Sequence, residues 1–97
     1  MRALRKLRAG DPALELCEVS EPVPGPGEAV LRVAAAGICG TDLHIRLDEY
    51  RSSPPVTLGH EVAGRVHALG EGVTGWEVGQ RAVTETYFFY CGVCAAC

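Results

Sequence analysis

Glycine and proline interrupt this chain so often that little room is left for long helices. The 97 residues contain twelve glycines and six prolines, and some stand close together, as in the PGPG sequence of residues 24–27. Both residue types favour turns and weaken the interior of helices and strands. Short segments separated by frequent turns are typical of all-β folds, and we predict a mainly β domain with its strands arranged as a barrel.

Alternation of apolar and polar residues predicts where the strands lie. Residues 1–7 and 13–19 alternate on either side of a turn-like Ala-Gly-Asp-Pro sequence, which indicates a β-hairpin. We expect a short helix at residues 41–47, with Thr41 as its N-cap and Asp42 in its first turn. The remaining predicted segments are strands at residues 28–36, 61–69 and 80–89, an extended linker at 21–27, a loop at 51–55 and a turn at 70–75.

The overall composition is that of one globular domain. Hydrophobic residues make up 47% of the chain and charged residues 22%, which excludes a disordered or fibrous protein. No apolar run approaches the roughly 18 residues that a membrane-spanning helix needs. The N-terminus lacks the apolar stretch of a secretory signal. We therefore expect a cytoplasmic protein with no membrane partner.

Basic residues concentrate at the N-terminus of a chain whose net charge is −3. The first eight positions hold Arg2, Arg5, Lys6 and Arg8, four of the nine basic residues. A basic segment can contact nucleic acid, but no aromatic or glycine-rich readout element accompanies this one. We interpret it as a solvated edge strand and expect no nucleic-acid partner.

The five cysteines favour metal binding over disulfides, because their number is odd and no secretory signal is present. Cys17 stands alone in an alternating segment and is expected to be a small core residue. By contrast, Cys91, Cys94 and Cys97 follow a C-x2-C-x2-C spacing that places three thiolates on one tight turn. Such a turn binds Zn²⁺ or an iron–sulfur cluster, and both usually need a fourth ligand.

A second set of candidate ligands is spread over two glycine-rich segments. Residues 37–44 read GICGTDLH and residues 59–64 read GHEVAG, so that Cys39 and His60 are 21 residues apart. Thiolate and imidazole are ligands that Zn²⁺ prefers. Only a tertiary fold can bring the two together, which is typical of a catalytic metal site built from separate loops.

Two segments match the residue patterns of familiar motifs but lack the structural context that those motifs require. Residues 60–64 begin like the HExxH helix of zinc proteases, but position 64 is glycine and the context is strand-like. The next histidine, His67, is expected to be a half-exposed strand residue. Residues 70–75 match GxGxxG, yet no helix fits after them, so we predict a turn and no dinucleotide fingerprint in this chain.

With these motifs in their order, the chain resembles the zinc-containing medium-chain alcohol, polyol and threonine dehydrogenases. The resemblance rests on the PGPGE sequence, the GICGTDLH and GHEVAG segments, Gly70 and Val73, and the three-cysteine turn. It implies the N-terminal catalytic domain of that family, a GroES-like, partly open β-barrel with short helices. It also implies that residues 1–97 are truncated within the structural-zinc lobe at 91–97, and that they lack the following Rossmann domain.

The resemblance assigns a role to each matching residue. Cys39 and His60 would bind the catalytic zinc, with Glu61 as a direct or transient ligand. Asp42 would orient the imidazole of His60. Thr41 would hydrogen-bond the alcohol and His44 would pass its proton towards solvent; both would lie on one side of a short helix.

Further roles implied by the resemblance concern the structural metal and the substrate. Cys91, Cys94 and Cys97 would be three of four ligands of a structural zinc. Tyr50 and Tyr87 fall where the family lines its substrate pocket, although core packing is an alternative for each.

We therefore expect the catalytic portion of an enzyme that oxidises a secondary alcohol, a polyol or a threonine-like substrate to the carbonyl. The hydride would pass to NAD or NADP held by the absent domain, and the complete protein would be a homo-dimer or homo-tetramer. One alternative is a stand-alone zinc-binding GroES-like module without catalysis, and another is an iron–sulfur electron carrier built on the three-cysteine turn.

Overall fold

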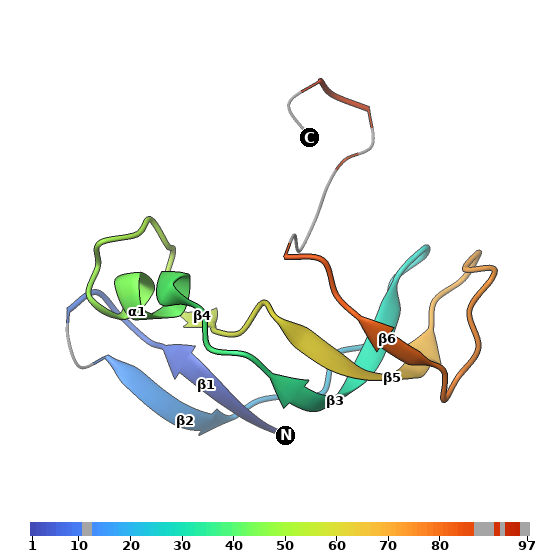
Figure 1. Cartoon of the computed structure of the whole chain (residues 1–97), viewed down its shortest axis with the longest axis horizontal. Helices are drawn as coiled ribbons and strands as arrows, with labels where there is room; N and C mark the ends of the chain where they lie inside the picture. The colour runs from blue at the N-terminus through green and yellow to red at the C-terminus, as the bar shows by residue number, and fades with distance from the viewer. Residues whose placement is uncertain (11–12, 87–90, 92, 96–97) are drawn as a thin grey trace.

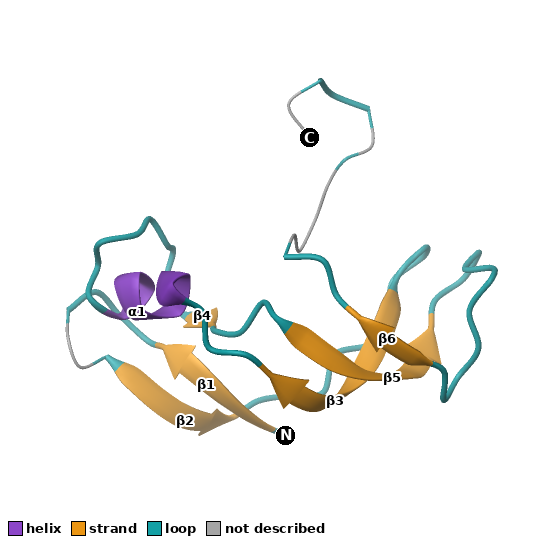
Figure 2. Ribbon diagram, in the orientation of Figure 1, coloured by secondary structure: helices purple, strands orange, loops and turns teal. Residues whose placement is uncertain are grey.

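Two three-stranded antiparallel sheets and one short helix form the regular structure of the computed structural model (Figures 1 and 2), which describes residues 1–10, 13–86, 91 and 93–95. One sheet has the order β2-β1-β4 and the other β3-β5-β6. The strands are β1 (Arg2–Lys6), β2 (Leu14–Glu18), β3 (Ala29–Ala36), β4 (Val56–Thr57), β5 (Val62–Leu69) and β6 (Arg81–Val83). Helix α1 (Gly40–Arg46) connects β3 to β4. The prediction of a mainly β fold is confirmed.

The first sheet is built on the predicted hairpin. Strands β1 and β2 pair antiparallel, with Leu4 opposite Leu16. The sequence did not predict β4, whose two residues pair with the other side of β1. As a result β1 is the central strand of its sheet, and the interpretation of this basic segment as an edge strand was wrong.

Lys6 also departs from the expected solvated segment, because it is completely buried, with 0% of its surface exposed, whereas Arg2 and Arg8 are exposed. Its ammonium group donates to the carbonyls of Ile45 at 2.6 Å and Arg46 at 3.0 Å, and to the carboxylate of Asp48. An ammonium group has three N–H donors, so each donor has an acceptor at the end of α1. Burial is tolerated because the charge is paired and hydrogen-bonded.

The end of α1 is an unusual turn. Asp48 lies in the left-handed region with φ 61°, where a residue with a Cβ atom costs about 1–2 kcal/mol relative to glycine. Its N–H donates to Ile45 O at 3.2 Å and the N–H of Glu49 donates to His44 O at 2.8 Å, which is the bond pair of a Schellman motif. The Asp48 carboxylate also accepts the Gly10 N–H at 2.6 Å. The hydrogen bond from Lys6, and then that from Gly10, keeps the pKa of Asp48 below its usual value.

The second sheet carries the longest strand pair. Strands β3 and β5 pair from Ala29 opposite Leu69 to Ala36 opposite Val62, with two register shifts. Gly64 lies where the bulged part of β3 comes closest: a Cβ atom there would run into the carbonyl oxygen of Arg32 and lie 3.0 Å from its carbonyl carbon. Position 64 therefore needs glycine for the close approach of two strands.

The strand predicted at residues 80–89 is shorter than expected. Strand β6 ends at Val83, after which the N–H of Thr84 still donates to Val62 O at 3.0 Å. Since β5 begins at Val62, residues 84–86 have no strand to pair with despite their β propensity. Residues 87–89 lie outside the described part of the chain.

Few residues are fully buried. Among the described apolar residues, only Ala13 and Val66 form a fully buried core. Cys17, predicted to be a core residue, is only half-buried. His67 lies on β5 as predicted, but it is exposed where a half-exposed residue was expected. Residues 70–75 form the predicted turn region between β5 and β6.

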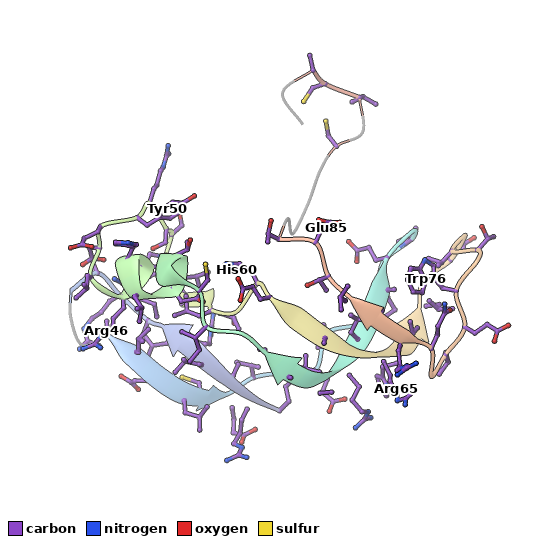
Figure 3. All side chains as sticks on the ribbon, in the orientation of Figure 1. Arg46, Tyr50, His60, Arg65, Trp76 and Glu85 are labelled. Atoms are coloured by element: carbon purple, nitrogen blue, oxygen red, sulfur yellow. The ribbon has the colours of Figure 1, made fainter. Side chains whose placement is uncertain are left out.

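Trp76 lies in the connection between β5 and β6, at the end of the second sheet away from His60 (Figure 3), and is 46% exposed. Within the described residues, none of the helical structure has the length and apolar character needed to cross a bilayer.

Candidate metal centre

Cys39 is held at the N-terminus of α1. It is the N-cap of the helix, with φ −87° and ψ 158°, so the prediction of Thr41 at that position was wrong by two residues. The N–H of Cys39 donates to Asp42 Oδ2 at 2.9 Å, and the N–H of Asp42 donates to Cys39 O at 3.1 Å. These reciprocal bonds fix the backbone of Cys39 where β3 gives way to the helix.

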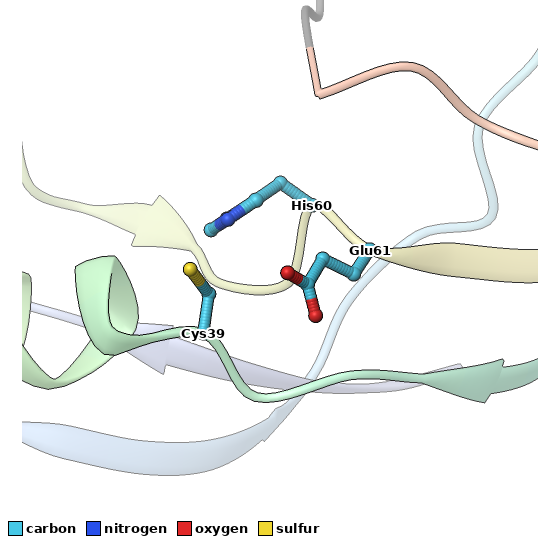
Figure 4. Close-up of side chains that lie close together, drawn as sticks. All are labelled: Cys39, His60 and Glu61. Carbon is cyan, nitrogen blue, oxygen red and sulfur yellow. The ribbon is translucent and has the colours of Figure 1, made fainter.

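His60 and Glu61 come from the segment just before β5. The N–H of Gly37 donates to Glu61 O at 2.8 Å, which ties this segment to the end of β3. A Cβ atom at position 37 would collide with the Glu61 carboxylate, so glycine makes room for that side chain. Ligand atoms of Cys39, His60 and Glu61 all lie within 4.8 Å of one another (Figure 4). The fold therefore unites residues that lie in two separate segments of the sequence.

Asp42 supports the cluster from the first turn of α1. Only 8% of its surface is exposed, and its Oδ1 atom is buried without a hydrogen-bond partner among the described residues. That oxygen lies 3.6 Å from Nδ1 of His60. A buried carboxylate oxygen is costly to leave unpaired, and a small movement of the imidazole would give it the Nδ1–H proton. Such a bond would fix the ring orientation and direct Nε2 of His60 away from Asp42.

The electrostatics favour the metal-binding form of the thiol. The backbone N–H of Thr41, followed by the His60 side chain, lowers the pKa of Cys39 below its usual value. The hydrogen bond with Cys39 raises the pKa of His60. The pair is thus biased towards a thiolate beside a protonated imidazole. A metal ion would use the thiolate and displace the imidazole proton.

The donor set fits a zinc ion. One sulfur, one imidazole nitrogen and one carboxylate oxygen are ligand types that Zn²⁺ accepts. A buried carboxylate oxygen lies next to the imidazole, as the partner that metal-bound histidines commonly need. Three protein ligands would leave a fourth position for water or substrate, which is the arrangement of catalytic zinc sites.

The other predicted catalytic residues lie on α1. The Cys39 thiol donates to Thr41 Oγ1 at 3.7 Å, so the hydroxyl lies beside the candidate ligand. His44 is three residues further along the helix, on the same side. Its Nδ1 lies 2.6 Å from Oε2 of Glu49. Nothing in the sequence pattern pointed to Glu49, because its contact with His44 depends on the Schellman turn.

A pocket of about 320 Å³ lies beside the ligands, and its lining includes His60, Glu61, Val83, Thr84 and Thr86. The two threonines were not predicted. Tyr50, an expected pocket residue, is 56% exposed in the loop after α1 and is not among the lining residues. Tyr87 lies outside the described residues, so a substrate-contacting role stays a prediction for both tyrosines.

The three-cysteine turn is described only in part. The N–H of Cys94 donates to Cys91 Sγ at 3.3 Å, an arrangement compatible with two thiolates on one tight turn. Cys97 lies outside the described residues. The structural zinc site at Cys91, Cys94 and Cys97 therefore remains a prediction.

The chain is similar in sequence to known dehydrogenases. Residues 25–97 match the family described as the alcohol dehydrogenase GroES-like domain. The chain is 42% identical over 97 residues to a sorbitol dehydrogenase of Halalkalibacterium halodurans, and 48% identical over 101 aligned positions to an L-threonine 3-dehydrogenase of Pyrococcus horikoshii. Each alignment covers all of this chain and 28% of the relative, so the chain spans little more than a quarter of their length.

Among solved structures, a zinc-binding dehydrogenase of Sinorhizobium meliloti bound to NADP superimposes with a TM-score of 0.77 and 41% sequence identity. That match covers 82% of this chain and 23% of the other. The likeness therefore extends over most of the described strands as well as the sequence.

Proposed function

Because this chain belongs to the zinc-containing medium-chain alcohol dehydrogenase family, whose GroES-like domain it forms, we propose that it supplies the catalytic metal centre of such an enzyme. The complete protein would oxidise a secondary alcohol, a polyol or a threonine-like substrate, with NAD or NADP as hydride acceptor. The sorbitol and threonine dehydrogenases among the relatives support this substrate class.

One observation carries the proposal: Cys39, His60 and Glu61 place three ligand atoms within 4.8 Å of one another. In the proposed site Cys39 and His60 hold the metal, and Glu61 binds directly or during part of the cycle. Asp42 holds the imidazole of His60 through Nδ1. The chemistry that zinc supplies at such a site is Lewis acidity towards the alcohol oxygen, which lowers the pKa of the hydroxyl.

Two side chains of α1, Thr41 and His44, would carry the proton from the alcohol to solvent. Thr41 is close enough to Cys39 to hydrogen-bond an alcohol bound beside the thiolate. His44 would accept the proton by way of the Thr41 hydroxyl. It would release the proton to solvent, since its side chain is 60% exposed. The pocket beside His60 and Glu61 would receive the carbon skeleton of the substrate, with Thr84 and Thr86 on its wall.

We further propose that a cofactor-binding domain elsewhere in the complete protein supplies NAD or NADP, and that the protein is a homo-dimer or homo-tetramer. Cys91, Cys94 and Cys97 would hold the structural zinc with a fourth ligand.

The experiment that tests this function uses two pairs of variants of the complete protein. Cys39→Ser and His60→Ala should each lose one zinc ion per chain and the NAD(P)-dependent oxidation of alcohols such as threonine or sorbitol. Cys17→Ser and His67→Ala are the matched controls and should keep both, because Cys17 and His67 lie on β2 and β5 outside the ligand group. Zinc is measured by elemental mass spectrometry and turnover by nicotinamide absorbance.

Full turnover in a Cys39→Ser protein that has lost this zinc would refute the assignment. Zinc bound through Cys39 and His60, in a protein that oxidises no alcohol, would favour the non-catalytic zinc-binding module instead.

A further inference from the structure

Glu49 reaches His44 through the turn that ends α1. The Schellman bonds bring the backbone of Glu49 to within 2.8 Å, N to O, of the His44 carbonyl. The same turn brings the carboxylate Oε2 to 2.6 Å from Nδ1 of the His44 ring. Glu49 is therefore joined to His44 twice, once through the main chain and once through the side chain.

This geometry depends on Asp48, the non-glycine residue with φ 61°. A residue in this conformation persists when its surroundings over-determine it, and such residues cluster at functional sites. Here the surroundings are the buried ammonium of Lys6 and the N–H of Gly10, both bonded to the Asp48 carboxylate. The first sheet thus fixes the turn, and the turn fixes Glu49 beside His44.

An ionised carboxylate only accepts hydrogen bonds, so the proton in the short Glu49–His44 contact belongs to Nδ1. We propose that Glu49 is a positioning residue that holds neutral His44 in the tautomer with Nδ1 protonated and the lone pair on Nε2. This inference rests on the proposed function, in which His44 accepts the proton from the alcohol.

The tautomer matters because an imidazole has one basic nitrogen when neutral. With Nδ1–H engaged by Glu49, Nε2 is the basic nitrogen, and the ring orientation is fixed by the same bond. Without Glu49, the ring would populate both tautomers and rotate more freely, so a smaller fraction of molecules would present a base to the relay. The expected loss is a part of the roughly 10²–10⁴-fold that general acid–base catalysis typically contributes.

The test compares Glu49→Ala and Glu49→Gln in the complete protein. Nitrogen-15 NMR of labelled histidine separates protonated from lone-pair nitrogens, and a His44→Gln protein assigns the His44 signals. In wild type and Glu49→Gln, His44 should carry its proton on Nδ1, because the glutamine side-chain oxygen can accept the same bond. In Glu49→Ala, the Nε2-protonated tautomer should appear.

Turnover provides the second readout. Glu49→Ala should lower kcat about tenfold with KM for the alcohol little changed, and Glu49→Gln should recover most of the loss. Glu15→Ala, which removes an exposed carboxylate on β2, is the control and should match wild type in both measurements.

An unchanged His44 tautomer in Glu49→Ala would overturn the proposal whatever the activity. So would a kcat loss in Glu49→Gln equal to that in Glu49→Ala. A wild-type protein that oxidises no alcohol would instead refute the proposed function, while the NMR spectra would still decide the tautomer.

Discussion

Asp42 serves two neighbours with its two carboxylate oxygens. One oxygen accepts the N–H of Cys39 and thereby caps α1, while the other is buried 3.6 Å from the His60 ring. The same side chain therefore sets the backbone of one candidate ligand and the orientation of another. The sequence placed Asp42 in the first turn of a helix, but its link to His60 depends on the tertiary fold.

Replacing Asp42 by asparagine should separate these two functions. The amide oxygen of the new side chain can still accept the Cys39 N–H, but an amide nitrogen facing His60 cannot accept its proton. We expect the zinc affinity of this site to fall roughly 10–100-fold, with little change in thermal stability. Competition with a chelator of known affinity measures the effect. Wild-type affinity in Asp42→Asn would contradict the proposed support of His60.

Lys6 provides a prediction about stability that is independent of the metal. Lys6→Met keeps the buried aliphatic length but removes the donor to two helix carbonyls and to Asp48. We expect a loss of about 3 kcal/mol in the free energy of unfolding, measured by urea denaturation. Arg2→Met, an exposed change on the same strand, should stay within about 0.5 kcal/mol of wild type. Equal effects of the two substitutions would show that burial of the ammonium group is unimportant.

Residue chemistry indicated which side chains could form a ligand set, but it did not indicate which other side chains the fold would bring against one another. Ligand chemistry paired Cys39 with His60, and the family resemblance added Glu61 to the same set. The sequence pattern placed Lys6 on the surface, because nothing in the N-terminal sequence shows that the end of α1 supplies three acceptors for its ammonium group. It missed Glu49 for the same kind of reason, since the contact with His44 requires the left-handed Asp48.

At the scale of elements, the boundaries that depend on a partner strand were the hardest to predict. The predicted strands match β1, β2, β3 and β5 to within one residue at each end. Strand β4 has only two residues and exists because β1 has a free side, which no local pattern reveals. Strand β6 stops early because its partner strand β5 begins at Val62, although the sequence after Val83 has strong β propensity.

The close approach of β3 and β5 gives a prediction for Gly64. Gly64→Ala would force a methyl group against the carbonyl of Arg32, so the two strands must separate at the bulge. We expect a loss of about 1–3 kcal/mol, seen as a lower Tm. Gly40→Ala is the matched control: nothing lies within 4 Å of its new methyl group, and alanine is favourable in a helix. An equal Tm for the two variants would mean that the strands adjust without cost.

At the scale of the whole molecule, the described residues expose many large apolar side chains. Ile38 is 82% exposed and Val83 is 78% exposed, and both adjoin the segments that build the metal centre. Large apolar side chains exposed beside a binding site can be covered by another surface of the complete protein. The enzyme proposed here would need such a cover beside its pocket to exclude water.

The 97 residues on their own should therefore be poorly soluble or oligomeric. The aromatic run at residues 87–90, outside the described structure, adds a segment with high β propensity and no charge. Size-exclusion chromatography with light scattering tests this expectation. A monodisperse monomer that unfolds in one cooperative transition would contradict it.

The position of Trp76 has a practical consequence for spectroscopy. It is the one tryptophan in these 97 residues. It lies in the β5–β6 connection, at the opposite end of the second sheet from His60 (Figure 3). Its fluorescence reports the solvent exposure of that connection. Metal binding at Cys39 and His60 should leave the emission of Trp76 nearly unchanged. A shift in Trp76 emission on adding metal would therefore reveal a rearrangement that travels the length of β5.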